Sequence, residues 1–193
     1  MITSSQEPIL YEDIQLTYTM EEFPRKGSAL YDMLKGNEES KKRSLRNWQR
    51  MNRVVIFLYE LGILPLIGLG YFILLLHTRG RRTGKTYVTP LEYRKQGISI
   101  LLFSSRGKTS DWYKNLRAHP ENAEVQIGFK KYHPSIEFIE DYTLATDILR
   151  WYIEKHPRSS QFLFGWNQKK DNLETADLKF ITDSIRIVRL NLV

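Results

Sequence analysis

A short cationic segment, RGRRTGKTYVTP over residues 79–90, restricts the possible folds of this chain more than any other feature. It approaches the phosphate-binding P-loop pattern, but Gly80 stands one residue too close to the Gly-Lys-Thr triplet at 84–86. The residues after the triplet are β-branched or aromatic, where a P-loop would open a helix. An apolar run at 71–76 precedes the segment. We therefore predict a loop between two strands, with four cations at its tip: Arg79, Arg81, Arg82 and Lys85.

Composition limits the chemistry that the chain can perform. Its 193 residues are enough for one domain with a buried core. The absence of cysteine excludes disulfides, thiol nucleophiles and thiolate metal sites. The four histidines lie far apart, with no spacing typical of a metal site, so we expect no metal. No basic stretch followed by an apolar core begins the sequence, which favours a cytoplasmic location over secretion.

Positive charge is concentrated in one segment. The formal net charge is +7, and residues 77–131 carry twelve Lys or Arg against four Asp or Glu. Such a field suits a small polyanionic ligand, nucleic acid or an anionic membrane surface. A solvated basic surface without a ligand is the plain alternative. We expect no nucleic-acid partner, because no known nucleic-acid-binding motif accompanies the charge.

Residues 40–61 are predicted to form an amphipathic helix. Apolar residues recur there at three- and four-residue steps, and four arginines recur on nearly the opposite face. Such a helix either covers the core of the domain or lies on a membrane. The apolar stretch at 54–76 is interrupted by Glu60, Pro65 and three glycines, so we do not expect it to span a bilayer. Peripheral membrane contact through residues 40–76 stays open.

The remaining pattern predicts short strands, with helices between them and at the ends. The expected strands are 86–93, 98–104, 123–129, 132–139 and 184–192, the expected helices are 112–118 and 143–156, and 161–177 is expected to be a loop. A small antiparallel barrel would leave few strand edges exposed. We expect a partly ordered N-terminal arm over 1–38, followed by a single domain over 39–193 that includes the amphipathic helix.

A second loop favours the same kind of ligand as the first. Residues 104–109 follow a predicted strand and precede a helix for which residues 109–111 supply N-cap chemistry. Hydroxyls, two cations and free N–H groups at a helix N-terminus favour a phosphate. The two loops together predict a groove for an anionic tail. Trp112 and Tyr113 are then available to cover a flat ring, or else they pack in the core.

Three segments in this order resemble the deazaflavin-dependent nitroreductase family. They are HTRGRRTG through TPL (77–84 and 89–91), SSRG (104–107) and DWYKNLRAHP (111–120). The resemblance implies an α+β, mainly β fold, a split β-barrel of the FMN-binding or flavin-reductase type with an N-terminal helical extension. It also implies coenzyme F420, a deazaflavin with a phosphate and an oligoglutamate tail. The implied reaction is hydride transfer from reduced F420 to a quinone-like or nitroaromatic acceptor, a small molecule.

The resemblance also assigns roles by position. It implies that Ser105 is the catalytic residue at the reactive edge of the deazaflavin, and that Arg82, Arg106 and Lys108 hold the phosphate and the tail carboxylates. The full set of implied cofactor-binding residues is Arg81, Arg82, Thr83, Gly84, Thr89, Pro90, Leu91, Ser104, Ser105, Arg106, Gly107, Lys108, Trp112, Tyr113 and Asn115. A homodimer is expected from the same resemblance.

The sequence departs from the family pattern on the acceptor side. Members with quinone activity carry tyrosines where this chain has the segment 156–159 (HPRS) and Glu92, and Lys108 replaces the second glycine of the later motif. These departures leave the acceptor open. Two alternatives remain, an FMN-binding oxidoreductase of the same fold and a non-catalytic carrier of a deazaflavin or a lipid.

Overall fold

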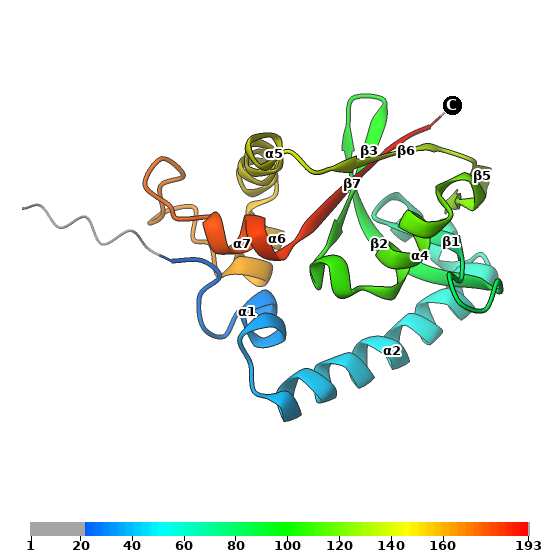
Figure 1. The fold of residues 1–193 in the computed structure, drawn as a ribbon, viewed down its shortest axis with the longest axis horizontal. Helices are drawn as coiled ribbons and strands as arrows, with labels where there is room; N and C mark the ends of the chain where they lie inside the picture. The colour runs from blue at the N-terminus through cyan, green and yellow to red at the C-terminus, as the bar shows by residue number, and fades with distance from the viewer. Residues whose placement is uncertain (1–21, 193) are drawn as a thin grey trace, which may run out of the picture.

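The computed structural model describes residues 22–192 and shows a curled antiparallel sheet with helices packed on both of its faces (Figure 1). The strands are β1 (Ile73–Arg79), β2 (Thr86–Gln96), β3 (Ser99–Ser104), β4 (Glu124–Ile127), β5 (Lys130–Tyr132), β6 (Ser135–Ile139) and β7 (Arg186–Asn191). They lie in the order β5-β4-β1-β2-β3-β7-β6. The helices are α1 (Ala29–Leu34), α2 (Glu38–Glu60), α3 (Ile63–Leu66), α4 (Asp111–Ala118), α5 (Tyr142–Lys155), α6 (Pro157–Phe164) and α7 (Lys179–Ser184), with short 3-10 turns η1 (Leu69–Tyr71), η2 (Gly107–Thr109) and η3 (Pro120–Asn122). The curled antiparallel sheet with helices confirms the predicted fold class.

The cationic segment joins two antiparallel strands, as predicted. β1 and β2 pair from Ile73 with Glu92 to Arg79 with Thr86. At the tip, Gly84 has a φ of 67°, a left-handed conformation that glycine adopts readily. Its N–H donates to the carbonyl of Gly80 at 2.8 Å. The segment that resembles a P-loop therefore continues into a strand and not into a helix.

One core lies between the sheet and α4. Because side chains alternate along a strand, every second residue of the central strands points to this face. The buried strand residues are Leu74, Leu76, Tyr93, Ile100, Leu102, Val125, Val188 and Leu190. From α4, Trp112, Tyr113 and Leu116 complete the same cluster. α4 is therefore fixed against the sheet by an apolar face, and this contact positions the two loops that flank it.

A second core lies on the opposite face of the sheet, under α5, α6 and α7. Leu101 of β3 and Ile187 of β7 face it, and α5 contributes four buried residues from Ile148 to Ile153. Phe23 and Leu30 are buried in the same cluster. From residue 22 onward the expected N-terminal arm is thus packed against the domain. The rest of that predicted arm, residues 1–21, lies outside the described residues.

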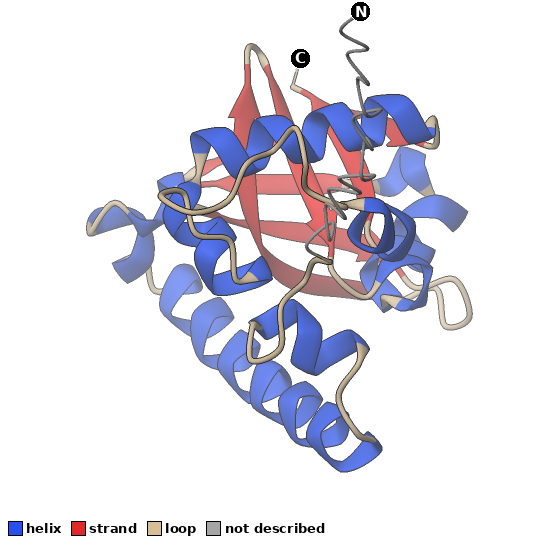
Figure 2. Ribbon diagram, turned by 90° about the vertical axis from the view of Figure 1, so that its left-hand side faces the viewer, coloured by secondary structure: helices blue, strands red, loops and turns tan. Residues whose placement is uncertain are grey.

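Only the C-terminal part of α2 covers the sheet (Figure 2). Tyr59 is buried with Leu64 and Leu75. Its hydroxyl accepts a hydrogen bond from the N–H of Gly128 at 2.7 Å and donates one to the carbonyl of Gln126 at 3.3 Å. Further toward the N-terminus the apolar side chains of α2 are exposed. The core-covering alternative therefore holds for the C-terminal end of α2, and membrane contact by its uncovered part stays a prediction.

Two expectations about strands and loops were wrong. The predicted strand 132–139 is two strands, since β5 pairs with β4 while β6 pairs with β7. Pro134 separates them, because it has no N–H to donate to a ladder. The predicted loop 161–177 begins inside α6, which ends at Gly165 with a φ of 75°. α7 was missed because six residues are too few to show a helical period.

Candidate cofactor site and adjoining pocket

The two predicted ligand loops lie at the same end of the sheet. The first loop leads into the start of β2, and the second leaves the end of β3. β2 and β3 are antiparallel, with Tyr93 opposite Leu102, so the start of β2 and the end of β3 point to the same end of the sheet. α4 contacts both loops through hydrogen bonds. The structure therefore brings together the two motifs that the sequence places about twenty residues apart.

Arg81 fastens the first loop to α4. Its Nη1 and its backbone N–H both donate to Oδ1 of Asn115, at 2.9 and 3.2 Å, and its Nη2 donates to Oδ1 of Asp111 at 3.1 Å. Asn115 is buried, so these bonds satisfy an amide oxygen that would otherwise be costly to bury. In this arrangement Arg81 and Asn115 position the loop, and their direct contact with a cofactor stays a prediction.

The second loop is held by its own hydroxyls and by one glycine. The hydroxyl of Ser104 is buried, donates to the carbonyl of Gly107 at 2.8 Å and lies 2.7 Å from the Ser110 hydroxyl. Gly107 has a φ of 52°, and a Cβ at this position would stand 2.2 Å from the carbonyl oxygen of Ser184. Only glycine fits there. Ser104 and Gly107 thus shape the loop, while the neighbouring cations remain at the surface.

Four cations of these loops are available for an anion. The side chains of Arg82, Lys85, Arg106 and Lys108 make no hydrogen bond or ion pair within residues 22–192. Three of them are exposed and Arg106 is half-buried. Guanidinium and ammonium groups in this number suit phosphate and carboxylate oxygens, which accept charge-assisted hydrogen bonds. The donor set therefore fits a cofactor with a phosphate and a carboxylate tail.

Ser105 lies on the face of the sheet that carries the second core, called the outer face below, and it is half-buried beside Met33 of α1. Among the described residues its hydroxyl donates only to the sulfur of Met33, at 3.8 Å, and a thioether is a weak acceptor. The hydroxyl is thus free to bond a better acceptor.

The other predicted residues lie in the first loop, on β2 or in the first core. Thr83 and Gly84 are exposed in the first loop, and Pro90 is half-buried on β2. Leu91 packs against the first core, the face that Thr89 shares by alternation. Trp112 and Tyr113 are buried there, with ring centroids 5.9 Å apart. Their packing is that of core residues, and their contact with a deazaflavin ring stays a prediction.

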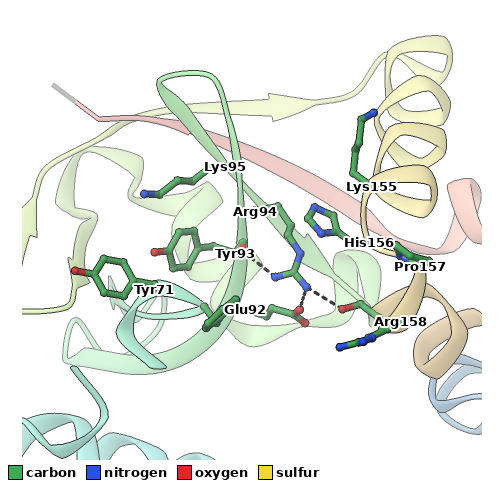
Figure 3. Close-up of a pocket in the computed structure, with 11 residues that line it drawn as sticks. Tyr71, Glu92, Tyr93, Arg94, Lys95, Lys155, His156, Pro157 and Arg158 are labelled. Carbon is green, nitrogen blue, oxygen red and sulfur yellow. Dashed lines mark hydrogen bonds and ion pairs between the residues drawn. The ribbon is translucent and has the colours of Figure 1, made fainter. Parts of the chain in front are cut away.

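A pocket of about 560 Å³ opens on the outer face, between β2 and the junction of α5 and α6 (Figure 3). Its lining comes from three segments of the chain: Tyr71 and Phe72, Glu92 to Lys95, and Lys155 to Ser159. Burial raises the pKa of Tyr93 to about 12. Burial, and then the charge of Arg94, lower the pKa of His156, which favours the neutral imidazole.

The sequence found only part of this pocket. The segment 156–159 and Glu92 were assigned to the acceptor side by resemblance. Arg94, Tyr71 and Phe72 were not singled out for it. No local motif marks them, because they meet only when β2, η1 and the α5–α6 junction are assembled.

Residues 22–192 contain neither a metal-binding cluster nor a membrane-spanning helix. No three His, Asp or Glu side chains there gather closely enough to hold a metal ion. No helix in that range is both long and apolar enough to cross a bilayer.

Comparison with known proteins supports the resemblance seen in the motifs. Residues 65–146 match the family described as F420H(2)-dependent quinone reductase, which confirms the similarity to deazaflavin-dependent reductases. An F420H(2)-dependent quinone reductase of Mycobacterium tuberculosis is 37% identical over 62 residues, which is 31% of this chain and 41% of that protein. The matched part is thus less than half the length of this relative.

Two solved structures resemble the chain more distantly. An F420-H2 dependent reductase (FDR-A) aligns with a TM-score of 0.41 and 22% identity, over 61% of this chain and 92% of that one. ChuZ of Campylobacter jejuni aligns with a TM-score of 0.44 and 13% identity, over 64% of this chain and 49% of that one.

Proposed function

We propose that this protein is an F420-dependent reductase that transfers a hydride from reduced F420 to a quinone-like or nitroaromatic acceptor. The observation that carries the proposal is the group of cations around α4 that have no partner within residues 22–192, inside the region that matches the quinone reductase family. Arg82 and Arg106 would bind the phosphate and the carboxylate tail. Arg81 and Asn115 would keep the first loop in place.

The chemistry is divided between cofactor and protein. When bound in its reduced form, the deazaflavin supplies a hydride, and a quinone that takes up this hydride and one proton becomes the hydroquinone. The protein orients the two partners on the outer face of the sheet, which lowers the entropic part of the barrier. Ser105 donates a hydrogen bond at the reactive edge, a role that its weakly engaged hydroxyl leaves free. α1 and α6 border this face.

A titration of the purified protein with F420, and in parallel with FMN, tests the cofactor. We expect F420 to bind and FMN to bind much more weakly, because FMN has a phosphate but no carboxylate tail for the remaining cations. Tight FMN binding would transfer the proposal to an FMN-dependent enzyme of the same fold. Binding of F420 without turnover of any acceptor would instead favour a carrier.

Ser105→Ala separates catalysis from binding. We expect the variant to bind F420 as the wild type does and to oxidise reduced F420 more slowly, because only the hydrogen bond at the reactive edge is lost. Unchanged turnover would remove Ser105 from the reaction. Thr109→Ala is a suitable control, since that hydroxyl bonds the carbonyl of Arg106 and points into its own loop.

We also propose that the uncovered part of α2 and the segment after it contact an anionic membrane surface from the cytoplasmic side. The exposed apolar side chains of this surface are Trp48, Met51, Val54, Phe57, Leu61, Leu66 and Ile67. Exposed arginines at 46, 50 and 53 provide charge complementary to anionic headgroups.

Vesicle flotation tests the membrane contact. We expect the protein to float with vesicles that contain phosphatidylglycerol, and the double variant Leu66→Glu, Ile67→Glu to stay behind. If the same variant instead converted a solution dimer into a monomer, as light scattering would show, the surface would be a homodimer interface.

A further inference from the structure

The pocket between β2 and the α5–α6 junction is lined by more positive than negative side chains. Four of its lining residues are cations, Arg94, Lys95, Lys155 and Arg158, and only Glu92 is acidic. Of these cations, Lys155 lies 3.3 Å from Glu154, in a pair with both side chains more than half exposed. Such an exposed pair offsets little of the Lys155 charge. Within the described chain, Lys95 and Arg158 have no hydrogen-bond or ion-pair partner. The pocket therefore carries a surplus of positive charge.

Arg94 forms the floor of this pocket (Figure 3). Only 10% of its side chain is exposed, whereas 49% of the Glu92 side chain is. Its Nη1 donates to the carbonyl of Tyr93 at 2.9 Å, and its Nη2 donates to Ser159 at 3.0 Å and to Glu92. Its Nε is buried without a partner among the described residues. Because Glu92 is half in solvent while Arg94 is not, the carboxylate offsets the buried charge only in part.

The rim of the pocket is aromatic. Tyr71 and Phe72 are 70% and 60% exposed, an unusual setting for two adjacent aromatic side chains. Pro157 adds a further apolar surface on the opposite side. A flat ring can contact this rim while a charged substituent on the ring reaches the cations. The combination favours a ligand that is both aromatic and anionic.

The pocket shares the outer face with Ser105. Arg94 is opposite Leu101 in the β2–β3 ladder, so alternation places Phe103 on the same face as Glu92 and Arg94. Ser105 follows in the turn after β3, and its hydroxyl contacts Met33, which packs against the second core on this face. Tyr152 connects the two positions. Its ring lies 4.9 Å from that of Phe103, and the guanidinium of Arg94 lies 5.5 Å from its centroid.

We propose that this pocket binds the electron acceptor and selects a flat aromatic acceptor that carries a carboxylate or a similar anionic group. Arg158 and Lys155 bind the anionic group, and Arg94 provides the fixed charge beneath them. As a substrate assignment, this inference rests on the proposed reductase function. The binding preference itself can be measured without F420.

A matched pair of ligands tests the charge preference directly. Anthraquinone-2-carboxylate and anthraquinone-2-carboxamide have the same flat ring, and only the first is anionic. We expect the cofactor-free protein to bind the carboxylate roughly tenfold more tightly than the carboxamide, the scale of one charge-assisted hydrogen bond. Equal affinity for the two ligands would overturn the inference.

Substitutions that reverse the charge of one residue show which residue causes the preference for the carboxylate ligand. Arg158→Glu should remove it and Arg158→Lys should retain most of it, since lysine keeps the charge. Lys169→Glu, which changes the net charge equally at an exposed loop position, should leave the preference as it is. A preference that survives in both Arg158→Glu and Lys155→Glu would place the anion elsewhere and overturn the assignment.

Turnover separates this inference from the proposed function. With reduced F420, hydride transfer and one proton convert either quinone to its hydroquinone, and we expect the carboxylate to show the lower KM. If the carboxylate binds selectively but neither ligand oxidises reduced F420, the pocket's preference for an anionic aromatic ligand stands, while the reductase proposal and the pocket's role as an acceptor site fail. If both ligands are reduced with the same KM, in wild type and Arg158→Glu alike, the reductase proposal stands and the pocket assignment fails.

Discussion

The two cationic regions of this protein are built in opposite ways. In the loops around α4, Arg82 and Arg106 make no bond in the described chain, while the backbone beneath them is closely fixed. In the pocket, the guanidinium of Arg94 is itself buried and bonded to three groups. The first region keeps its cations available for a ligand. In the second, one cation belongs to the folded structure and sets the potential for its neighbours.

Among the substitutions that test this comparison, one in the fixed backbone of the second loop should lower stability the most. Gly107→Ala places a Cβ against the carbonyl of Ser184 in a left-handed conformation, so we expect a loss of about 3 kcal/mol in the free energy of unfolding. Urea unfolding measures it. Gly97→Ala is the control, because Gly97 also has a positive φ, 61°, but open space around its Cβ position. Equal losses in both variants would mean that the contact with Ser184 is unimportant.

The contrast between buried and exposed arginines predicts a difference in stability. Arg94→Met removes bonds to Tyr93, Ser159 and Glu92, and we expect it to lower the free energy of unfolding by about 2 kcal/mol. Arg82→Met should change it by less than about 0.5 kcal/mol, as is usual for exposed positions. Chemical denaturation of both variants checks the pair. A stable Arg94→Met variant would contradict the structural role of this arginine.

In F420 binding, by contrast, the exposed arginines should have the larger effect. Arg82→Ala and Arg106→Ala are each expected to weaken F420 binding by about 1.5 kcal/mol, the scale of one charge-assisted contact. Neither change should affect the free energy of unfolding noticeably. Fluorescence titration gives the affinities, with Lys169→Ala as the control for net charge. Unaltered titration curves would exclude these arginines from the cofactor site.

The smallest expected effect concerns His156 at the edge of the pocket. Its pKa in the folded protein is lowered by burial and by Arg94, so the unfolded chain binds the proton more readily. The stabilisation that comes from keeping the imidazole neutral is therefore complete above the ordinary histidine pKa of about 6.5. It is lost as the pH falls through the lower pKa of the folded state. We expect His156→Gln to reduce the slope of stability against pH below neutrality. His77, whose pKa burial also lowers, should keep a residual slope.

Local patterns in the sequence predicted much of the fold and one of the two cationic regions. The β-branched residues after Lys85 identified β2, and the motif order predicted both ligand loops, which the structure brings to the same end of the sheet. Inside α4 the sequence left Trp112 and Tyr113 open between a cofactor and the core, and the structure buries both. Such a distinction depends on tertiary packing, which a helical period alone does not reveal.

The pocket could not be predicted in the same way. Arg94 and Ser159 are 65 residues apart in sequence, and their hydrogen bond exists only because α6 packs beside β2. Similarly, nothing local indicated that Phe23 would enter the second core. The sequence signals for these contacts are single residues without a period or a motif. Long-range contacts of this kind become visible only in the folded chain.

The position of β7 in the sheet has a consequence for how quickly the chain folds. This strand lies between β3 and β6, and the side chain of Ser99 bonds that of Asn191, 92 residues away in sequence. Pairing across such a separation requires closure of a long loop before any compensating contact forms. Folding should therefore be slow compared with that of a helical bundle of this size. Until β7 is inserted, β3 and β6 expose unpaired edges that invite association between chains.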